Sequence, residues 1–389
     1  MIRRRSCAAA LCAMLAALAL PVAASADPGP YVALGDSYTA GPLIPNLVGQ
    51  PRGCGRSDHN YPSLVAAASG ITQFRDESCS AAKTDDMTVR QRVLLGMHIP
   101  QFDALRPDAT LVTIGIGGND VKLVDAAVRC LQLGLLAPTG RSCRRHFAYP
   151  GGDVVVDRIA ATAPKIAATL QGIHARAPQA RVLILGYPNV GPRPGLSCYP
   201  LVPLSADDLV YLGEMLRRTN AMIAEQAAAN DAEYVDTYDD SLGHDVCTGP
   251  RTRWFEGVLP TSPAFPIHPN ARGEASMAYS VLRVLAQPPP GPALTELTVA
   301  RPRIAAGRAA RVSYALSRAD SVTFTLQRSL GGGRYTGALG TWTVAASPGY
   351  NTFTLTATQL GRRPGLYRLT VTPQNGAPQV VQFRVLRRR

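Results

Sequence analysis

This 389-residue sequence lacks several features that would mark it as a membrane protein or a metal-binding protein. After its first 26 residues it has no apolar run of the roughly 20 residues that a membrane-spanning helix needs, which argues against an integral membrane protein. It has no CxxC pair and no paired Cys/His spacing, so we expect no metal site. Lysine is rare, since Lys83, Lys122 and Lys165 are the only three, and the basic charge therefore comes from arginine.

The N-terminus carries the one long apolar run. A basic region, Arg3 to Arg5, precedes apolar residues 7–20, and Ala24-Ser25-Ala26 has the small-x-small pattern of a cleavage site. The run is short for a membrane anchor. We therefore predict a signal peptide over residues 1–26 and a secreted, extracellular protein.

Cysteine usage agrees with export. Six cysteines remain after the predicted signal, and all lie before residue 250: Cys54, Cys79, Cys130, Cys143, Cys198 and Cys247. An even number in an exported chain predicts disulfide bonds, but spacing does not choose among the many connectivities.

The net charge of +13 is unevenly distributed. Residues 293–389 hold 14 arginines against Glu296 and Asp320, a balance of +12, whereas residues 27–292 carry 23 basic and 25 acidic side chains. We expect the basic segment to contact an anionic cell-envelope surface, with a passive spacer as the alternative. Nucleic acid is not expected as a partner, because the arginines are interleaved with strand residues and the protein is exported.

Strands and helices alternate through the first two thirds of the chain. Apolar runs predict buried strands over residues 31–35, 109–116, 181–186 and 232–236. Helical patterns cover residues 61–69, 99–105, 121–136, 153–175, 205–230 and 269–285. This order predicts an α/β domain over residues 27–286 with a parallel sheet covered on both faces.

A composition change marks a second domain. The proline-rich segment 287–292 is a stiff linker. Beyond it, alternating patterns predict short strands over residues 294–299, 311–316, 321–326, 352–355 and 367–371, with a hairpin turn at the three glycines 331–333. We predict an immunoglobulin- or fibronectin-like β-sandwich over residues 293–389.

Three polar motifs occur in order across the α/β domain: Gly35-Asp36-Ser37, Gly117-Gly118-Asn119-Asp120 and His268-Pro269-Asn270. The first two directly follow buried strands, so they meet at the edge of a parallel sheet where such proteins place their chemistry. Taken alone, Ser37 is more typical of a helix cap and His268 of a structural histidine. The combination instead indicates a nucleophile, an amide donor and a base.

On these motifs the chain resembles the SGNH/GDSL hydrolases, in particular their secreted actinobacterial esterase and lipase branch, over residues 30–286. The resemblance implies a three-layer, flavodoxin-like αβα fold and a carboxylic-ester hydrolase without a cofactor. It implies the disulfides Cys54–Cys79, Cys130–Cys143 and Cys198–Cys247. It also implies that Ser37 attacks the ester, that His268 transfers the proton, and that Asn119 and the Ser37 N–H stabilise the oxyanion.

Two positions depart from the family pattern. The other oxyanion donor of the family is a glycine, and the matching position here is Ala81, whose N–H can serve only if the local φ tolerates a Cβ. The family aspartate three residues before the histidine is replaced by Phe265. The resemblance therefore implies a Ser–His dyad in which a main-chain carbonyl, that of Phe265, orients the ring. Acids that could fold in from elsewhere are Asp239, Asp245 and Glu256.

The leading interpretation is a monomeric, secreted esterase or lipase that acts on small-molecule or lipid esters. A glycan O-deacetylase is an alternative within the same chemistry. A protein that binds cell surfaces or polysaccharides on an inactive hydrolase fold is the alternative from another class, and the retained Ser37, Asn119 and His268 argue against it.

Overall fold

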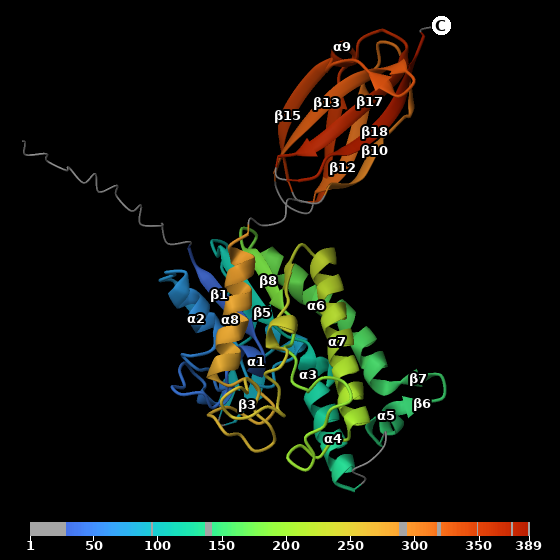
Figure 1. Ribbon diagram of the computed structural model, residues 1–389. Coiled ribbons are helices and arrows are strands. Elements are labelled where there is room, and N and C mark those ends of the chain that lie inside the picture. The colour runs from blue at the N-terminus through green and yellow to red at the C-terminus, as the bar shows by residue number, and fades with distance from the viewer. Residues whose placement is uncertain are drawn as a thin grey trace, which may run out of the picture.

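The computed structural model describes residues 29–94, 96–136, 142–287, 294–316, 320–347, 349–374 and 376–387. The predicted signal peptide over residues 1–26 and residues 288–292 of the predicted linker lie outside the described residues. The described chain forms an α/β part before residue 288 and a strand-rich part from residue 294 onward (Figure 1).

A five-stranded parallel sheet is the centre of the α/β part. Its spatial order is β2-β1-β5-β8-β9, which is the order 2-1-3-4-5 of flavodoxin-like folds. The strands are β1 (Tyr31–Gly35), β2 (Phe74–Asp76), β5 (Leu111–Gly115), β8 (Arg181–Leu185) and β9 (Glu233–Val235). Every residue of β1 and β5 is buried, because helices cover both faces of the sheet.

Helices on the two faces complete three layers (Figure 1). One pair is α2 (Tyr61–Ala68) and α8 (Ala271–Leu285), which contact each other on one side. The opposite pair is α6 (Val154–Arg176) and α7 (Ala206–Ala229). Shorter elements are α1 (Ser37–Ala40), α3 (Gly118–Val121), α4 (Leu123–Leu136), α5 (Ser142–Phe147), η1 (Arg52–Cys54), η2 (Thr84–Met87), η3 (Gln101–Ala104), η4 (Asp239–Ser241) and the hairpins β3 (Gln91–Val93) with β4 (Gly96–His98) and β6 (Ala148–Tyr149) with β7 (Gly152–Asp153).

The predicted elements are present, with three local corrections. The helix expected over residues 121–136 starts at Gly118 and is interrupted at Lys122, whose φ is +61°. The helix expected from residue 269 begins at Ala271, because the Asn270 side chain caps it by accepting from the Arg272 and Gly273 N–H groups. The segment 99–105 forms only the short 3₁₀ helix η3.

Two sheets form the C-terminal β-sandwich, and all their strand pairs are antiparallel except β11 with β18, which is parallel. The smaller has the order β10-β12-β16, and the larger has the order β11-β18-β17-β13-β14, with β15 also paired to β13. The strands are β10 (Leu294–Val299), β11 (Arg303–Ala305), β12 (Ala310–Leu316), β13 (Asp320–Gly331), β14 (Arg334–Tyr335), β15 (Gly340–Ala346), β16 (Gly349–Leu355), β17 (Gly365–Pro373) and β18 (Gln379–Leu386), with the short helix α9 (Ala357–Leu360). Alternate residues of β12, β13 and β17 fill the core between the sheets.

No helix among the described residues is long and apolar enough to cross a membrane.

Candidate active site

Ser37 stands at the sharp turn between β1 and α1. Gly35 has a φ of +143°, and a Cβ there would come within 2.3 Å of the Thr39 hydroxyl and 2.6 Å of the Gly115 carbonyl. Asp36 is the helix cap and accepts from the Tyr38 N–H at 2.9 Å. The capping function therefore belongs to Asp36, and the Ser37 hydroxyl is left for another partner.

That partner is His268. The Ser37 Oγ lies 2.7 Å from His268 Nε2, and the His268 Nδ1 lies 2.8 Å from the Pro266 carbonyl oxygen. Because a carbonyl only accepts, Nδ1 carries the proton, Nε2 is the acceptor, and the Ser37 hydroxyl donates to it. Burial lowers the pKa of His268 to about 4, although the Pro266 carbonyl opposes the shift. The ring is therefore neutral and ready to accept a proton at neutral pH.

The identity of the orienting carbonyl differs from the sequence prediction. Phe265 was expected to supply it, but the Phe265 carbonyl accepts from the His268 main-chain N–H at 3.2 Å instead. This bond closes a tight turn in which Ile267 has a φ of +61°, the positive value that the third residue of a type II turn requires. In such a turn the middle peptide carries the Pro266 carbonyl, and the structure presents that oxygen to the ring.

Aromatic side chains hold the His268 ring. The ring of Tyr38 lies 4.9 Å from it, and the Tyr38 hydroxyl donates to the Ile267 carbonyl at 2.7 Å. The Phe265 ring packs edge-on at 5.3 Å. Tyr38 comes from α1, so the helix that begins at Ser37 also fixes the loop that carries its partner.

No acid supports the histidine in the described part of the chain. The Asp245 carboxylate accepts from the Cys247 N–H at 2.9 Å, and Glu256 is bonded to Asn270 and Thr261. Asp239 starts the 3₁₀ helix η4. Among the described residues, the hydrogen bonds of the His268 ring therefore go to a hydroxyl and a carbonyl only.

Asn119 meets Ser37 because the strands that precede them are in register. Gly35 pairs with Gly115, so β1 and β5 end side by side. Asn119 lies in α3, and its side-chain amide donates to the Ala82 carbonyl at 2.9 Å. An amide nitrogen has two hydrogens, so one remains for a substrate oxygen.

Tyr187, which the sequence motifs did not single out, joins the two turns. Its hydroxyl donates to Asp36 Oδ2 at 2.5 Å and accepts from the Gly118 N–H at 2.7 Å. The Tyr187 side chain is buried. Only glycine fits at position 118, because a Cβ there would come within 2.8 Å of the tyrosine ring. Burial of Asp36 raises the pKa of its carboxyl to about 7.

The loop containing Ala81 is braced by its neighbours. Ala81 has a φ of +64°, in the left-handed region that the glycine of the family pattern would favour. Ser80 donates its N–H and its hydroxyl to the Cys54 carbonyl, at 3.0 and 2.8 Å, and accepts from Gln91 at 2.7 Å. The Ala81 N–H has no acceptor in the described part of the structure, so it is available to a substrate.

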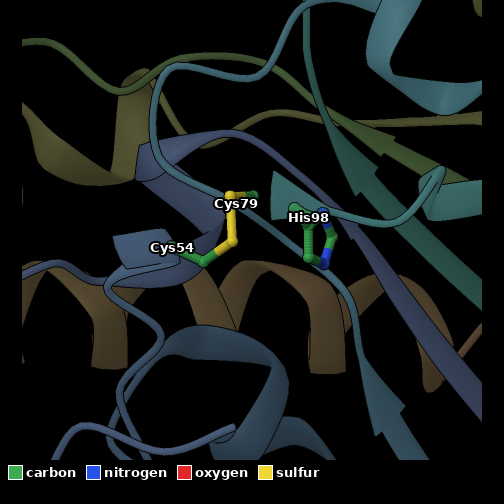
Figure 2. Close-up of side chains that lie close together, drawn as sticks. All are labelled: Cys54, Cys79 and His98. Atoms are coloured by element: carbon green, nitrogen blue, oxygen red, sulfur yellow. A yellow bond between two sulfur atoms is a disulfide. The ribbon is translucent and has the colours of Figure 1, made fainter. Parts of the chain in front are cut away.

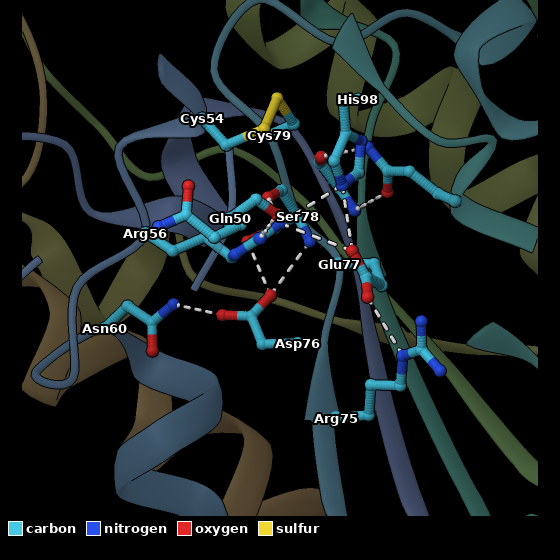
Figure 3. Close-up of polar contacts among 12 residues, drawn as sticks. Gln50, Cys54, Arg56, Asn60, Arg75, Asp76, Glu77, Ser78, Cys79 and His98 are labelled. Atoms are coloured by element: carbon cyan, nitrogen blue, oxygen red, sulfur yellow. Dashed lines mark hydrogen bonds and ion pairs between the residues drawn. A yellow bond between two sulfur atoms is a disulfide. The ribbon is translucent and has the colours of Figure 1, made fainter. Parts of the chain in front are cut away.

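A disulfide and a buried ionic network lie beneath this loop. Figure 2 shows the Cys54–Cys79 bond beside His98, and Figure 3 shows His98 Nε2 bonded to Glu77 at 2.8 Å. Arg56 donates to the Ser78 carbonyl at 3.0 Å and lies 3.4 Å from Glu77 (Figure 3). Potential ligand atoms of Cys54, Cys79 and His98 lie within 4.8 Å of one another. Because the two sulfur atoms are bonded to each other, they provide no thiolate for a metal ion.

The structure contains the three disulfides that the resemblance implies: Cys54–Cys79, Cys130–Cys143 and Cys198–Cys247.

An apolar pocket opens beside Ser37. Ser37 and Asn119 lie in its wall together with Tyr38, and Ala81 is not among its lining residues. The rest of the wall is largely aliphatic and comes from α4, α7 and the loops around them: Leu123, Val124, Ala127, Leu131, Val190, Val202, Leu204, Leu209, Leu212, Leu216, Val246, Val258 and Ile267. Sequence motifs did not reveal this pocket, because its residues read as the core faces of two ordinary amphipathic helices.

Comparison with known proteins agrees with this geometry. Residues 33–275 match the GDSL-like Lipase/Acylhydrolase family. The chain is 40% identical over 265 residues to Lipase 2 of Streptomyces coelicolor, covering 66% of this chain and 85% of that protein.

Two solved structures are similar to the α/β part. Phospholipase A1 from Streptomyces albidoflavus has a TM-score of 0.55 at 26% identity, with 66% of this chain and 98% of that one covered. An extracellular lipase from Streptomyces rimosus has a TM-score of 0.54 at 28% identity, with 67% and 100% covered.

Proposed function

Because the chain belongs to the GDSL-like Lipase/Acylhydrolase family and is a carboxylic-ester hydrolase, we propose that it works through an acyl-enzyme on Ser37, with His268 as the base. The observation that carries this proposal is the 2.7 Å contact between Ser37 Oγ and the unprotonated Nε2 of His268. The Pro266 carbonyl takes the orienting position that an aspartate holds in a Ser-His-Asp triad.

The reaction has two halves. Ser37 Oγ attacks the ester carbonyl carbon while its proton passes to His268 Nε2, and the resulting oxyanion is stabilised by the Asn119 amide and the N–H groups of Ser37 and Ala81. The histidine returns the proton to the departing alkoxide, which leaves as an alcohol. Water then attacks the acyl-enzyme with His268 again as base, and the carboxylic acid and free Ser37 are released.

The pocket favours an aliphatic acyl group. Its wall beyond Ser37 is largely hydrocarbon, so a fatty acyl chain would bury apolar surface there, whereas an acetyl group on a glycan would leave most of it unfilled. The relatives named above are two lipases and a phospholipase A1. We infer that the natural substrates are lipid acyl esters rather than acetylated glycans.

The setting is inferred to be extracellular. The basic and apolar segments before Ala26, the three disulfides, and the description of the Streptomyces rimosus relative as extracellular all support secretion. We further propose that residues 27–286 and 293–389 are separate domains and that the protein acts as a monomer.

A labelling and turnover experiment tests the mechanism. The purified protein is treated with a serine-reactive phosphonate, mapped by mass spectrometry, and assayed on p-nitrophenyl esters from short to long acyl chains. We expect the label on Ser37, loss of turnover of about a thousandfold or more in Ser37→Ala and His268→Ala, and a preference for chains longer than acetyl.

Asp245→Asn is the control, because this acid is buried near the site but has no contact with His268. It should retain substantial turnover. A loss as large as that of His268→Ala would refute the dyad, and a label on another residue would refute the nucleophile.

A further inference from the structure

Most of the described arginines of the β-sandwich lie toward one end of it. Strand register defines this end: Gly365 at the start of β17 pairs with Val385 at the end of β18, and Ala305 at the end of β11 pairs with Leu386. Loops 306–309 and 361–364 and the segment after β18 therefore meet there, beside α9 (Figure 1). We call this the distal end. Its loops carry Arg308, Arg362, Arg363 and Arg387, all exposed.

The other sheet adds to the same charge. Ala310 at the start of β12 pairs with Leu355 just before α9, so Arg311 is also at the distal end. Arg301 follows β10, whose last residue pairs with Val312. Arg303 and Arg384 are direct neighbours across β11 and β18. The three remaining described arginines of the sandwich are on β13, β14 and the first half of β17, where Arg328 pairs with Tyr367.

Both acids of the sandwich are at the opposite end. Asp320 is the first residue of β13 and pairs with Ala346 at the end of β15. The Glu296 carboxylate accepts from the Tyr350 hydroxyl, and Tyr350 pairs with Ala315 near the end of β12. Within the described residues, no ion pair joins a sandwich arginine to a carboxylate. Among the residues that the structure describes, the distal end is thus a cluster of positive charge that no carboxylate pairs with.

Exposed leucines lie among these arginines. Leu386 is 40% exposed between Arg384 and Arg387, and Leu330, the next-to-last residue of β13, is 54% exposed. Leu339 precedes β15 and is 51% exposed. The strand register places Leu386 and Leu330 at the distal end, since Leu386 pairs with Ala305 and Leu330 lies two residues past Arg328, which pairs with Tyr367 near the start of β17. Leu339 lies nearer the middle of the sheet, because its N–H donates to the carbonyl of Leu326, which pairs with Leu369. A soluble polyanion would gain nothing from these side chains, whereas a lipid surface accepts both charge and apolar groups.

We propose that the distal end of the sandwich docks on an anionic lipid surface, with the arginines contacting lipid phosphates and the leucines entering the headgroup region. The combined attraction of several arginines to such a surface makes the attachment strong at low salt and reversible at high salt. This function is separate from ester hydrolysis and brings the enzyme to surfaces where acyl lipids are concentrated.

The test measures vesicle binding by the full chain in a Ser37→Ala background, so that lipid is not consumed and the result is independent of the proposed nucleophile. Protein is sedimented with phosphatidylcholine vesicles, with and without phosphatidylglycerol, from about 0.05 to about 0.5 M NaCl. We expect binding only with phosphatidylglycerol and a steep loss with salt. Substitution of Arg362, Arg363 and Arg387 by Gln should weaken it on the order of 100-fold.

The matched control removes the same number of exposed arginines from the α/β part, by substituting Arg90, Arg145 and Arg251 with Gln. It should bind like the parent protein. An equal loss in this control would overturn the proposal, because the attraction would then follow net charge rather than the distal end. Binding to phosphatidylcholine alone that is unaffected by the triple substitution would also overturn the proposal.

A second variant tests the lipid against an anionic polymer. Leu330→Ser with Leu386→Ser should lower vesicle affinity while leaving the salt dependence unchanged. If the protein instead binds immobilised poly(glycerol phosphate) more tightly than vesicles, and the leucine variant matches the parent on both, the surface serves a polymer and the lipid proposal is wrong. Thermal melting of each variant confirms folding.

Discussion

At the scale of single residues, His268 shows how burial sets the working range of a base. Water exclusion lowers its pKa to about 4, so the neutral ring persists well below the ordinary titration range of histidine. We predict that kcat/KM for a p-nitrophenyl ester rises with pH through about 4 and that His268 causes no further inflection between about 6 and 8. A pH–rate profile measures this, with Asp245→Asn as a control of unchanged shape.

Asp36 complicates that profile and offers its own test. Its pKa is raised to about 7, so a second inflection near this value is expected to vanish in Asp36→Asn. An inflection near 6.5 that persists in Asp36→Asn would show that His268 titrates like an exposed histidine.

The same carboxyl predicts a pH-dependent stability. Because the folded state holds the Asp36 proton more tightly than the unfolded state does, its contribution is complete below about 3.8 and is lost as pH rises through about 7. The parent protein should therefore lose on the order of 3 kcal/mol relative to Asp36→Asn between pH 4 and pH 8. Urea unfolding of both proteins at the two pH values measures this difference. His268 has the opposite linkage but is present in both proteins, so its effect cancels. An equal change in unfolding free energy between the two pH values in both proteins would contradict the raised pKa of Asp36.

At the scale of elements, the loop 78–82 depends on what lies under it. The Cys54–Cys79 bond and the hydrogen bonds from Ser80 to Cys54 hold the segment that carries Ala81. Replacing both cysteines by alanine should cost about 3 kcal/mol of stability and lower kcat, because the loop gains freedom. Chemical denaturation and ester turnover below the melting temperature measure the two effects.

The Cys130–Cys143 bond provides the comparison, since it joins α4 to α5 and has no contact with that loop. Its removal should lower stability by a similar amount with a smaller loss of kcat. Equal losses of kcat in the two variants would show that bracing of the loop is not what the first disulfide contributes.

At the scale of the whole molecule, the α/β part and the sandwich have separate hydrophobic cores. About two thirds of this chain, 66% and 67%, is enough to cover 98% and 100% of the two solved Streptomyces structures. We predict that a chain ending at Gln287 folds and keeps kcat/KM on soluble p-nitrophenyl esters within about threefold of the full chain. Circular dichroism and ester assays check this, and a chain that fails to fold would show that the sandwich stabilises the hydrolase.

Local sequence was sufficient to predict the elements with strong periodicity. The fully apolar β1 and β5, the long helices α6 and α7, and the alternating β12 and β13 follow from burial patterns over short windows. The strands β2, β15 and β18 were missed because their edge positions or mixed composition weaken the pattern. The polar turns after β1 and β5 were also predictable, since parallel strands end at one edge of a sheet.

What only the tertiary structure decided is which groups meet. The carbonyl that accepts from His268 Nδ1 is set by the turn at Ile267, and it belongs to Pro266 rather than to Phe265. The bridge from Asp36 through Tyr187 to Gly118 joins residues 151 and 69 positions apart, and no local pattern encodes such pairs. The sequence by itself determined that the C-terminal segment is basic, because net charge follows from counting its basic and acidic side chains. Strand register alone determined that its arginines gather at one end, because direction in a sheet is set by pairing between distant segments.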